Sequence, residues 1–189
     1  RLAGEAAVDY LATAQADPED AEWAERIARH REHRPEHWRA IEAAGPGDVT
    51  ELLAVDGGAV LLDSVTSWLD SLIRAVGLWD DRPDAKDLLA AEIDRLVGAW
   101  AATTRRVVAV SDEIGSGLAP DAGSRRLFRD VLGLLNLTVL EHSLAGIRAN
   151  RGEDIVLETL GLDDRATHEL FARGDTDGVF QLDGPQIRA

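Results

Sequence analysis

Three short runs of mainly hydrophobic residues stand out along the first two thirds of the chain. They lie within residues 8–14, 59–63 and 106–113, and each of these segments ends in small polar or acidic residues. Uninterrupted hydrophobic runs of this length are typical of strands that are buried on both faces of a parallel sheet. The pattern therefore predicts three buried strands that end in polar groups.

Between these runs, the hydrophobic residues recur at helical spacing. Trp23 and Ile27 lie four residues apart, after an Asp17–Pro18 pair that favours a helix start, and Pro35 favours the helix end. A short helix is expected around Asp48. Longer helices are expected over residues 65–76, 84–103, 127–147 and 164–172. This alternation predicts an α/β fold with a mainly parallel sheet and helices on both faces.

The composition excludes several functional classes. The 189 residues are 45% hydrophobic and include no cysteine, so disulfides and thiolate chemistry are excluded. A net charge of −15 argues against general binding to nucleic acid or anionic membranes. No hydrophobic run approaches the roughly 20 residues of a membrane span. We expect a cytoplasmic protein, and because the first residue is Arg1 we expect its natural start upstream.

A basic, histidine-rich segment interrupts this acidic background. Residues 28–38 contain three of the five histidines together with three arginines. Such a segment could hold a phosphate, and a neutral imidazole attacks phosphorus well near pH 7. On spacing alone, the more frequent interpretation is a solvated helix end with charge pairs three and four residues apart. Both interpretations stay open at this point.

Polar residues also follow each predicted strand. Thr13, Asp63 and the segment from Ser111 to Glu113 come at the ends of the three runs. Ligands of parallel sheets bind beyond the carboxyl ends of the strands, which share one edge. Asp63 could hold Mg²⁺ there or cap the following helix. We expect one rim that carries Thr13, Asp63 and the 111–113 segment, with the histidine-rich segment beside it.

Several motifs carry a resemblance over residues 1–136. The segments are Tyr10–Ala14, Glu25–Arg31, Arg34–Arg39, Val60–Leu69, Val108–Gly117 and Phe128–Asp130. In this order they resemble the bifunctional adenosylcobinamide kinase and adenosylcobinamide-phosphate guanylyltransferase family of cobalamin synthesis. The resemblance implies a P-loop, RecA-like fold, a trimer, a corrinoid substrate, and GTP or ATP with Mg²⁺. Family members phosphorylate adenosylcobinamide and then add GMP from GTP through a guanylylated histidine.

The resemblance also implies which residues form the site. The nucleophile falls on His30, with His33 and then His37 as weaker candidates. Arg31 and Arg34 would supply forked donors for phosphate oxygens, and Asp63 would organise Mg²⁺. Ser111 and Glu113 are secondary candidates. The positions that contact the nucleotide fall on Ala12, Thr13, Ala14, Arg31, Glu32, His33, Arg34, Glu42 and Asp63.

Two departures from the family pattern bear on activity. The family opens with a strand and a glycine-rich loop that ends in Gly-Lys-Ser, and this sequence begins after that point. Asp70 and Asp112 stand where the family usually has asparagine, and added negative charge should weaken triphosphate binding. We therefore expect an impaired enzyme, with a catalytically inactive protein that at most binds nucleotide as the alternative.

The C-terminal third resembles a different family. The segments Leu132–Leu140, Ile147–Glu153 and Ala172–Gly184 are similar to the alpha subunit of bacterial DNA polymerase III, over residues 130–189. Asp130 falls on one palm carboxylate of that family, but the partner carboxylates are missing, so polymerase chemistry is not expected. We interpret the chain as a hybrid, with a nucleotide-binding α/β domain over residues 1–136 and a mostly helical segment over residues 137–189. A polymerase fragment is the third alternative.

Overall fold

The structure of the protein is a computed structural model that describes residues 7–15, 21–32, 34–114, 123–161 and 163–173. The side chains of Glu22, Trp23, Arg26, His30, Leu170 and Phe171 lie outside the described part. The chain forms two compact units, residues 1–152 and residues 153–189. The first unit contains the sheet and is the one that positions the candidate site.

Four parallel strands form the sheet, in the order β2-β1-β3-β4. They are β1 (Val8–Ala12), β2 (Arg39–Glu42), β3 (Ala59–Asp63) and β4 (Val107–Val110). The three strands predicted from hydrophobic runs are confirmed, and so is the α/β class. The fourth strand, β2, was not predicted because Ile41 is its only large hydrophobic residue. Backbone pairing with β1, and not a hydrophobic pattern, makes this segment a strand.

Helices connect the strands and follow the last one. Those of the first unit are α1 (Ala21–Glu32), α2 (Gly47–Ala54), α3 (Val65–Ala75), α4 (Ala85–Ala102) and α5 (Gly123–Arg151). The short helix predicted around residue 48 is confirmed as α2. The helices predicted over residues 65–76 and 84–103 are confirmed to within one residue at each end. The predicted start of α1 at Asp17–Pro18 lies outside the described residues. Ser64 caps α3, because its side chain accepts a 3.1 Å hydrogen bond from the backbone N–H of Ser67.

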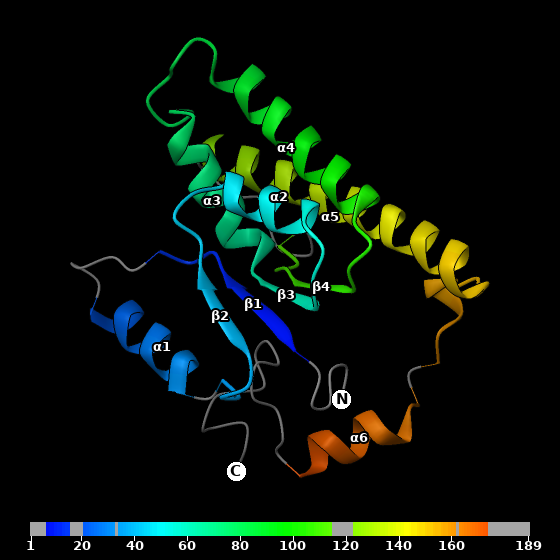
Figure 1. The fold of residues 1–189 in the computed structure, drawn as a ribbon. Helices are drawn as coiled ribbons and strands as arrows, with labels where there is room; N and C mark the ends of the chain where they lie inside the picture. Colours follow the sequence, from blue (N-terminus) through cyan, green and yellow to red (C-terminus); the bar gives the residue numbers. More distant parts are fainter. Residues whose placement is uncertain (1–6, 16–20, 33, 115–122, 162, 174–189) are drawn as a thin grey trace. The chain divides into compact units, whose positions relative to one another are not determined.

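The strand order places the helices on different faces of the sheet. Strand β2 lies on one side of β1, and β3 and β4 lie on the other. Right-handed crossovers therefore put α1 on the opposite face from α2 and α3. In Figure 1, α2 to α5 lie together above the strands, and α1 lies apart from them beside β2. The predicted helices on both faces are therefore present, but α1 is the one described helix on its face.

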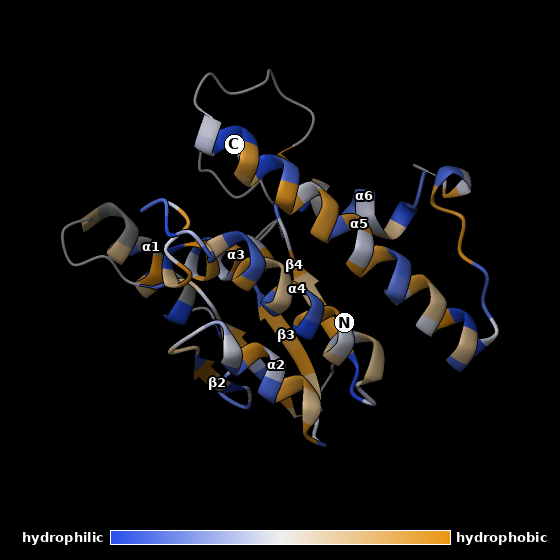
Figure 2. Cartoon of the chain, turned by 90° about the horizontal axis from the view of Figure 1, so that it is seen from above, coloured by the Kyte–Doolittle hydropathy of each residue, from blue (hydrophilic) through white to orange (hydrophobic). Residues whose placement is uncertain are grey.

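The two faces of the sheet differ in burial. Leu11, Val60 and Leu62 point toward α2 to α5 and belong to the hydrophobic core. Strand β3 is accordingly strongly hydrophobic beneath the helices in Figure 2. On the other face, the edge strand β4 exposes Val108 and Val110, to 38% and 45%. Because side chains alternate along a strand, one set of alternate residues faces the core under the helices and the other set faces the more exposed side of the sheet.

An ion-pair network connects the strands near their amino ends. Asp9 on β1 accepts two 2.7 Å hydrogen bonds from Arg39 and a further one from Nη2 of the buried Arg105. Arg105 also donates to the carbonyls of Gly58 (2.8 Å) and Leu52 (3.0 Å). The hydrogen bond from Arg39, together with that from Arg105, lowers the pKa of Asp9 against the opposing effect of burial. Asp9 therefore stays ionised and joins β1, β2 and the start of β4.

Helix α5 is a single 29-residue helix, longer than the predicted 127–147. Its residues Leu132 and Leu135 are buried in the core of the first unit. Further along, the Trp100 indole on α4 donates a 3.2 Å hydrogen bond to Ser143 Oγ. The residues of α5 beyond position 136 thus pack on the α/β unit.

The second unit is short and helical in its described part. A 3₁₀ turn (Leu157–Thr159) precedes α6 (Arg165–Ala172), which confirms the helix predicted over residues 164–172. Asp164 Oδ2 accepts a 2.7 Å hydrogen bond from the N–H of Thr167 and so caps α6. Among the helices described in both units, none has the length and hydrophobicity needed to cross a membrane.

Candidate functional site

All four strands of the sheet end at the same level and form one rim. Ala12 on β1 pairs with Glu42 on β2 and with Asp63 on β3, and Asp63 in turn pairs with Val110 on β4. The residues that follow these positions therefore leave the sheet side by side. Thr13 and Asp63 lie together at this edge, as the sequence predicts, and Glu42 joins them.

Thr13 ties the end of β1 to the start of α3. Its hydroxyl donates a 2.7 Å hydrogen bond to the carbonyl of Ser64 and accepts a 2.9 Å hydrogen bond from the N–H of Ser64. The Thr13 N–H also donates to the carbonyl of Asp63 at 2.9 Å. Thr13 is only 3% exposed. These contacts hold the backbone from the Asp63 carbonyl to the Ser64 carbonyl in place.

Tyr10 orients that carboxylate. The two residues lie on the same face of neighbouring strands, and the Tyr10 hydroxyl donates a hydrogen bond to Asp63 Oδ2. Burial, together with this hydrogen bond, raises the pKa of Tyr10 well above its usual value, so the hydroxyl stays protonated and remains a donor. Asp63 Oδ1 has no hydrogen-bond partner within the described residues and is available to a ligand.

Arg34 lies directly over Tyr10. The centre of its guanidinium is 4.0 Å from the centroid of the Tyr10 ring, a cation–π contact. Trp38 stacks on the same ring, with the centroids 6.2 Å apart. The Arg34 side chain is only 13% exposed, and its Nε is buried without a hydrogen-bond partner in the described part of the chain. A buried donor left in this way points to a missing acceptor, such as a phosphate oxygen.

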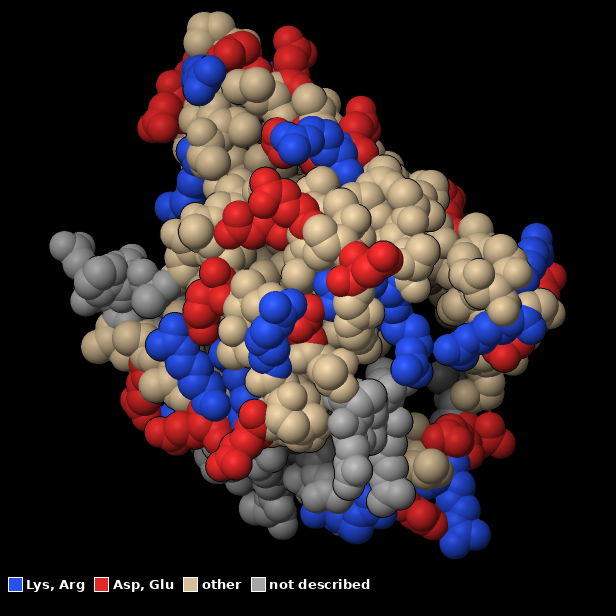
Figure 3. Space-filling view, viewed as in Figure 1, with Lys and Arg blue, Asp and Glu red and all other residues tan. Residues whose placement is uncertain are grey.

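Glu42 holds two arginines at the end of β2. Its Oε1 lies 3.3 Å from Arg31 Nε and 3.3 Å from Arg34 Nη1. Burial would raise the pKa of Glu42, but the hydrogen bonds from Arg31 and Arg34 outweigh it and the pKa is lowered. Basic side chains accordingly lie among acidic ones over α1 and β2 in the space-filling view (Figure 3). The predicted positions 31, 34 and 42 are therefore brought together.

The structure describes the candidate histidines unequally. The backbone of His30 lies in α1, two residues before the helix ends at Glu32, but its side chain is outside the described part. His33 lies entirely outside the described residues. Glu32 and His37 are exposed, and the His37 ring meets Trp38 edge-on with the centroids 6.4 Å apart. The nucleophilic role of His30 therefore stays a prediction.

The secondary candidates lie after β4, at the far end of the rim. Ser111 donates a 2.6 Å hydrogen bond to Asn136 Oδ1 on α5. Asn136 Nδ2 donates to the carbonyl of Asp112 at 3.1 Å, and the Asp112 N–H donates to Thr66 Oγ1 at 2.9 Å. Glu113 is exposed. Ser111 thus joins the rim to α5, and no chemical role for Ser111 or Glu113 follows from these contacts.

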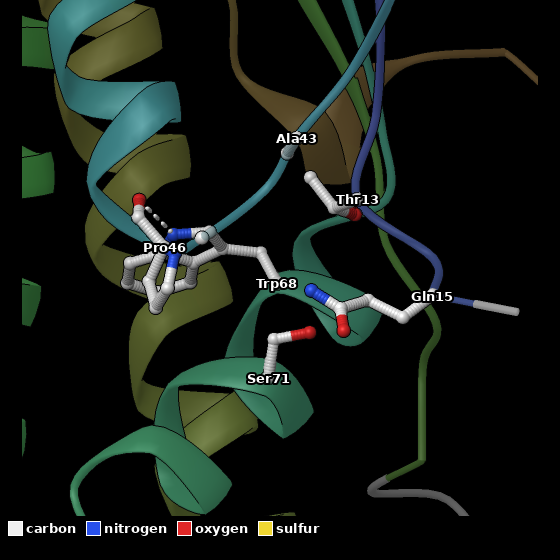
Figure 4. Close-up of a pocket in the computed structure, with 7 residues that line it drawn as sticks. Thr13, Gln15, Ala43, Pro46, Trp68 and Ser71 are labelled. Carbon is white, nitrogen blue, oxygen red and sulfur yellow. Dashed lines mark hydrogen bonds between the residues drawn. The ribbon is translucent and has the colours of Figure 1, made fainter. Parts of the chain in front are cut away.

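A small pocket opens beside Thr13 (Figure 4). Within it, the Gln15 amide and the Ser71 hydroxyl point toward one another. The Trp68 indole forms one wall and donates a 2.9 Å hydrogen bond to the carbonyl of Pro46. The lining residues are Thr13, Gln15, Ala43, Gly45, Pro46, Trp68 and Ser71. Ala14, which is half-buried, lies in the chain between two of them.

The donor set at the rim fits a magnesium ion bound together with a nucleotide. Among the described residues, no three His, Cys, Asp or Glu side chains gather to hold a metal ion on their own. Mg²⁺, however, is usually bound by one or two carboxylates together with substrate phosphates. The unpartnered Oδ1 of Asp63 meets that requirement.

Sequence reasoning assigned no role to Tyr10, Trp38 or Ser64. One signal was available for Tyr10, because it lies two residues before Ala12 and therefore on the same face of β1. Trp38 and Ser64 gave no comparable signal, since their contacts depend on which strands are neighbours.

Two family patterns match the chain. The pattern described as "Cobinamide kinase / cobinamide phosphate guanyltransferase" matches residues 2–155. The pattern described as "Bacterial DNA polymerase III alpha subunit finger domain" matches residues 136–189. The two matches overlap over residues 136–155, which lie mainly in the second half of α5.

Individual relatives come from both families. The bifunctional adenosylcobalamin biosynthesis protein CobU of Escherichia coli (strain K12) is 38% identical over 136 residues, which are 67% of this chain and 72% of the relative. The CobP protein of the same description from Pseudomonas aeruginosa is 37% identical over 144 residues, 75% and 78% of the two chains. The DNA polymerase III subunit alpha of Mycobacterium tuberculosis (strain H37Rv) is 58% identical over 59 residues. That segment is 31% of this chain but spans only 5% of the polymerase subunit.

Proposed function

This chain belongs to the cobinamide kinase / cobinamide phosphate guanyltransferase family, and from that membership we propose that it acts in cobalamin synthesis. The proposed reaction is transfer of GMP from GTP to adenosylcobinamide phosphate, through a guanylylated histidine. The family pattern covers residues 2–155, a span that includes the whole rim. His30 is the proposed nucleophile, with His33 as the second candidate.

The observation that carries the proposal is the contact of Arg34 with Tyr10 and of Tyr10 with Asp63. These contacts place a cation with an unpartnered, buried Nε beside a carboxylate with a free oxygen. A nucleoside triphosphate needs both, because its phosphates need cationic donors and its Mg²⁺ needs a carboxylate. Arg31, held by Glu42, adds a second guanidinium. His30, the proposed nucleophile, directly precedes Arg31 and therefore belongs to the same segment of the chain.

The first proposed step forms the covalent intermediate. An unprotonated imidazole nitrogen of His30 attacks the α-phosphorus of GTP, and the bond from this phosphorus to the bridging oxygen of the β-phosphate breaks. Pyrophosphate leaves with the bonding electrons, and GMP remains on the histidine through a P–N bond. Arg31 and Arg34 stabilise the charge that builds on the phosphate oxygens. A Mg²⁺ held by Asp63 would neutralise charge on the leaving pyrophosphate.

The second proposed step restores the enzyme. An oxygen of adenosylcobinamide phosphate attacks the same phosphorus, the P–N bond breaks, and the histidine regains its lone pair. The product carries GMP joined to the corrinoid through a new pyrophosphate linkage. Splitting one displacement into two in this way is the general advantage of covalent catalysis.

The family resemblance also implies a kinase reaction on adenosylcobinamide, and we include it in the proposal. That reaction uses a Gly-Lys-Ser loop, which the printed sequence does not contain; its one lysine is Lys86, on the exposed side of α4. The kinase reaction is therefore tested on a chain to which such a loop has been added. We further propose the trimer and the cytoplasmic location that the resemblance implies.

Labelling with GTP tests the proposed intermediate. The protein is incubated with Mg²⁺ and GTP labelled at the α-phosphorus or at the γ-phosphorus. We expect acid-labile, base-stable label from the α-labelled nucleotide only, and its loss in His30→Ala. His37→Ala and His142→Ala, two exposed histidines, are the matched controls and should keep the label. A wild-type protein that stays unlabelled, with or without an added Gly-Lys-Ser segment, would refute the catalytic proposal and favour a catalytically inactive hybrid that at most binds nucleotide.

A further inference from the structure

A second concave site lies between α3, the end of β4 and the first turns of α5. It is a cleft of about 780 Å³, which falls within the usual range of small-molecule sites. Among the described residues, it shares no lining residue with the pocket beside Thr13. The lining residues are Asp70, Arg74, Trp79, Ile114, Ser124, Arg125, Phe128 and Arg129.

The charges of this cleft differ from those of the whole chain. Three arginines and one aspartate line it, in a protein whose net charge is −15. The aspartate is neutralised locally, since Asp70 Oδ2 lies 2.8 Å from Arg74 Nε. Arg129 is paired with Asp130 at 3.0 Å, a residue that does not line the cleft. Arg125 has no ion-pair partner among the described residues. The cleft therefore offers cationic donors in surroundings that otherwise repel anions.

Its hydrophobic surface is mainly aromatic. Trp79 is 37% exposed and Phe128 is half-buried, and both rings line the cleft. Ile114, which is 36% exposed, adds an aliphatic surface. Exposed aromatic side chains of this kind bind the faces of flat rings, and guanidinium groups bind phosphate oxygens through paired hydrogen bonds. Few kinds of small molecule carry both a flat ring and a phosphate group.

From this combination we propose that the cleft binds an organic phosphate that carries a flat aromatic ring, of the size of a mononucleotide. Arg125 is the principal phosphate donor, with Arg74 and Arg129 beside it, and Trp79 stacks on the ring. This site is separate from the proposed catalytic rim, and it does not require that His30 be the nucleophile.

Indole N–H signals in NMR test the proposal, because each site has its own tryptophan. Trp79 lines the cleft and Trp38 stacks on Tyr10 at the rim. The full chain is titrated with GMP, with guanosine and with inorganic phosphate, without divalent cations. We expect saturable movement of the Trp79 signal with GMP, identified by its absence in Trp79→Phe. Guanosine and inorganic phosphate should each bind at least about tenfold more weakly than GMP.

Arg125→Gln is the decisive variant, and Arg126→Gln, which changes an adjacent arginine outside the lining, is its control. Arg125→Gln should weaken GMP binding about tenfold or more, while the signals of the buried Trp68 and of Trp100 confirm an unchanged fold. A Trp79 signal that GMP does not move, that guanosine moves equally, or that responds in Arg125→Gln as in the wild type would overturn the proposal. Movement of the Trp38 signal alone would support the catalytic rim and refute the cleft.

Discussion

Thr13 and Ser64 exchange two hydrogen bonds through one hydroxyl group. The Thr13 hydroxyl donates to the Ser64 carbonyl at 2.7 Å and accepts from the Ser64 N–H at 2.9 Å. The two residues lie just past the ends of neighbouring strands, and Asp63, the last residue of β3, directly precedes Ser64. The hydroxyl thus takes the place of a further pair of backbone hydrogen bonds between β1 and β3, at the point where the two strands end.

Thr13→Val should therefore be costly although the two side chains have nearly the same shape. It leaves the N–H of Ser64 without a partner in a largely buried place, while the Ser64 carbonyl keeps its 3.0 Å hydrogen bond from the Trp68 N–H. We expect a cost of about 1–3 kcal/mol in the free energy of unfolding. Thr13→Ser keeps the hydroxyl and should lose less. Urea unfolding followed by circular dichroism measures the stability of both variants. Equal stability of Thr13→Val and wild type would contradict the assigned contacts.

Tyr10→Phe separates the hydroxyl of this residue from its ring. The variant keeps the contacts of the ring with Arg34 and Trp38 but removes the hydrogen bond to Asp63. We expect a loss of about 0.5–1.5 kcal/mol in the free energy of unfolding. If Asp63 binds Mg²⁺ as proposed, labelling by GTP should also need more Mg²⁺. Tyr10→Leu, which also removes the ring, should be less stable than Tyr10→Phe in the same urea series. Equal stability of the two would show that the ring contributes nothing.

Asp9→Asn should remove a pH-dependent part of the stability. The pKa of folded Asp9 is lowered from 3.8, so its contribution is present above the unfolded pKa of about 3.9 and is lost as the pH falls through the folded value. Near pH 7 the variant leaves Arg105 buried without its carboxylate, at a cost of about 3–5 kcal/mol. The difference in the free energy of unfolding between wild type and variant should become smaller below about pH 4.

Urea unfolding at pH 7, 5, 4 and 3 checks this prediction. Asp70→Asn is the control, because its pair with Arg74 is an exposed pair four residues apart on a helix, and its loss should cost at most about 0.5 kcal/mol. A gap between wild type and Asp9→Asn that stayed constant over the whole pH range would show that Asp9 is not held ionised by its arginines.

Two glycines should respond to alanine in opposite directions. At Gly58, a Cβ would lie 2.5 Å from the backbone carbonyl oxygen of Ala7, so Gly58→Ala must displace β1 or β3. We expect a loss of roughly 1–3 kcal/mol. At Gly133 on α5, a Cβ would meet no atom within 4 Å, and Gly133→Ala should stabilise by about 0.5–1 kcal/mol. Thermal unfolding should show a lower midpoint for the first and a higher one for the second; a shift of both in one direction would contradict the geometry.

The sequence predicted those elements whose own residues determine them. Strand β3 and helices α3 and α4 carry long hydrophobic patterns, and their predicted ends lie within one residue of the observed ones. The rim was also predictable, because the carboxyl ends of parallel strands must share an edge. Strand β2 was not, because its exposed residues carry no such pattern and it forms by pairing with β1.

The contacts that hold the rim and the strand bases were beyond prediction for a different reason. Asp9 meets Arg39 and Arg105 across 30 and 96 positions of sequence, and Tyr10 meets Asp63 across 53. These contacts follow from the strand order β2-β1-β3-β4, which places β1 in the interior. Hydrophobic patterns indicate that strands exist but not which strands are neighbours.

Helix α5 gives the two family matches a common piece of backbone. The matches overlap over residues 136–155, and the helix, which runs from Gly123 to Arg151 without a break, covers residues 136–151 of that overlap. Trp100 binds Ser143 within the same stretch. A protein cut at residue 136 would keep the buried Leu132 and Leu135, but it would lose Val139, which packs against the core, and the hydrogen bond between Trp100 and Ser143. Anyone who wishes to separate the two parts has to cut after Gly152, where the first unit ends.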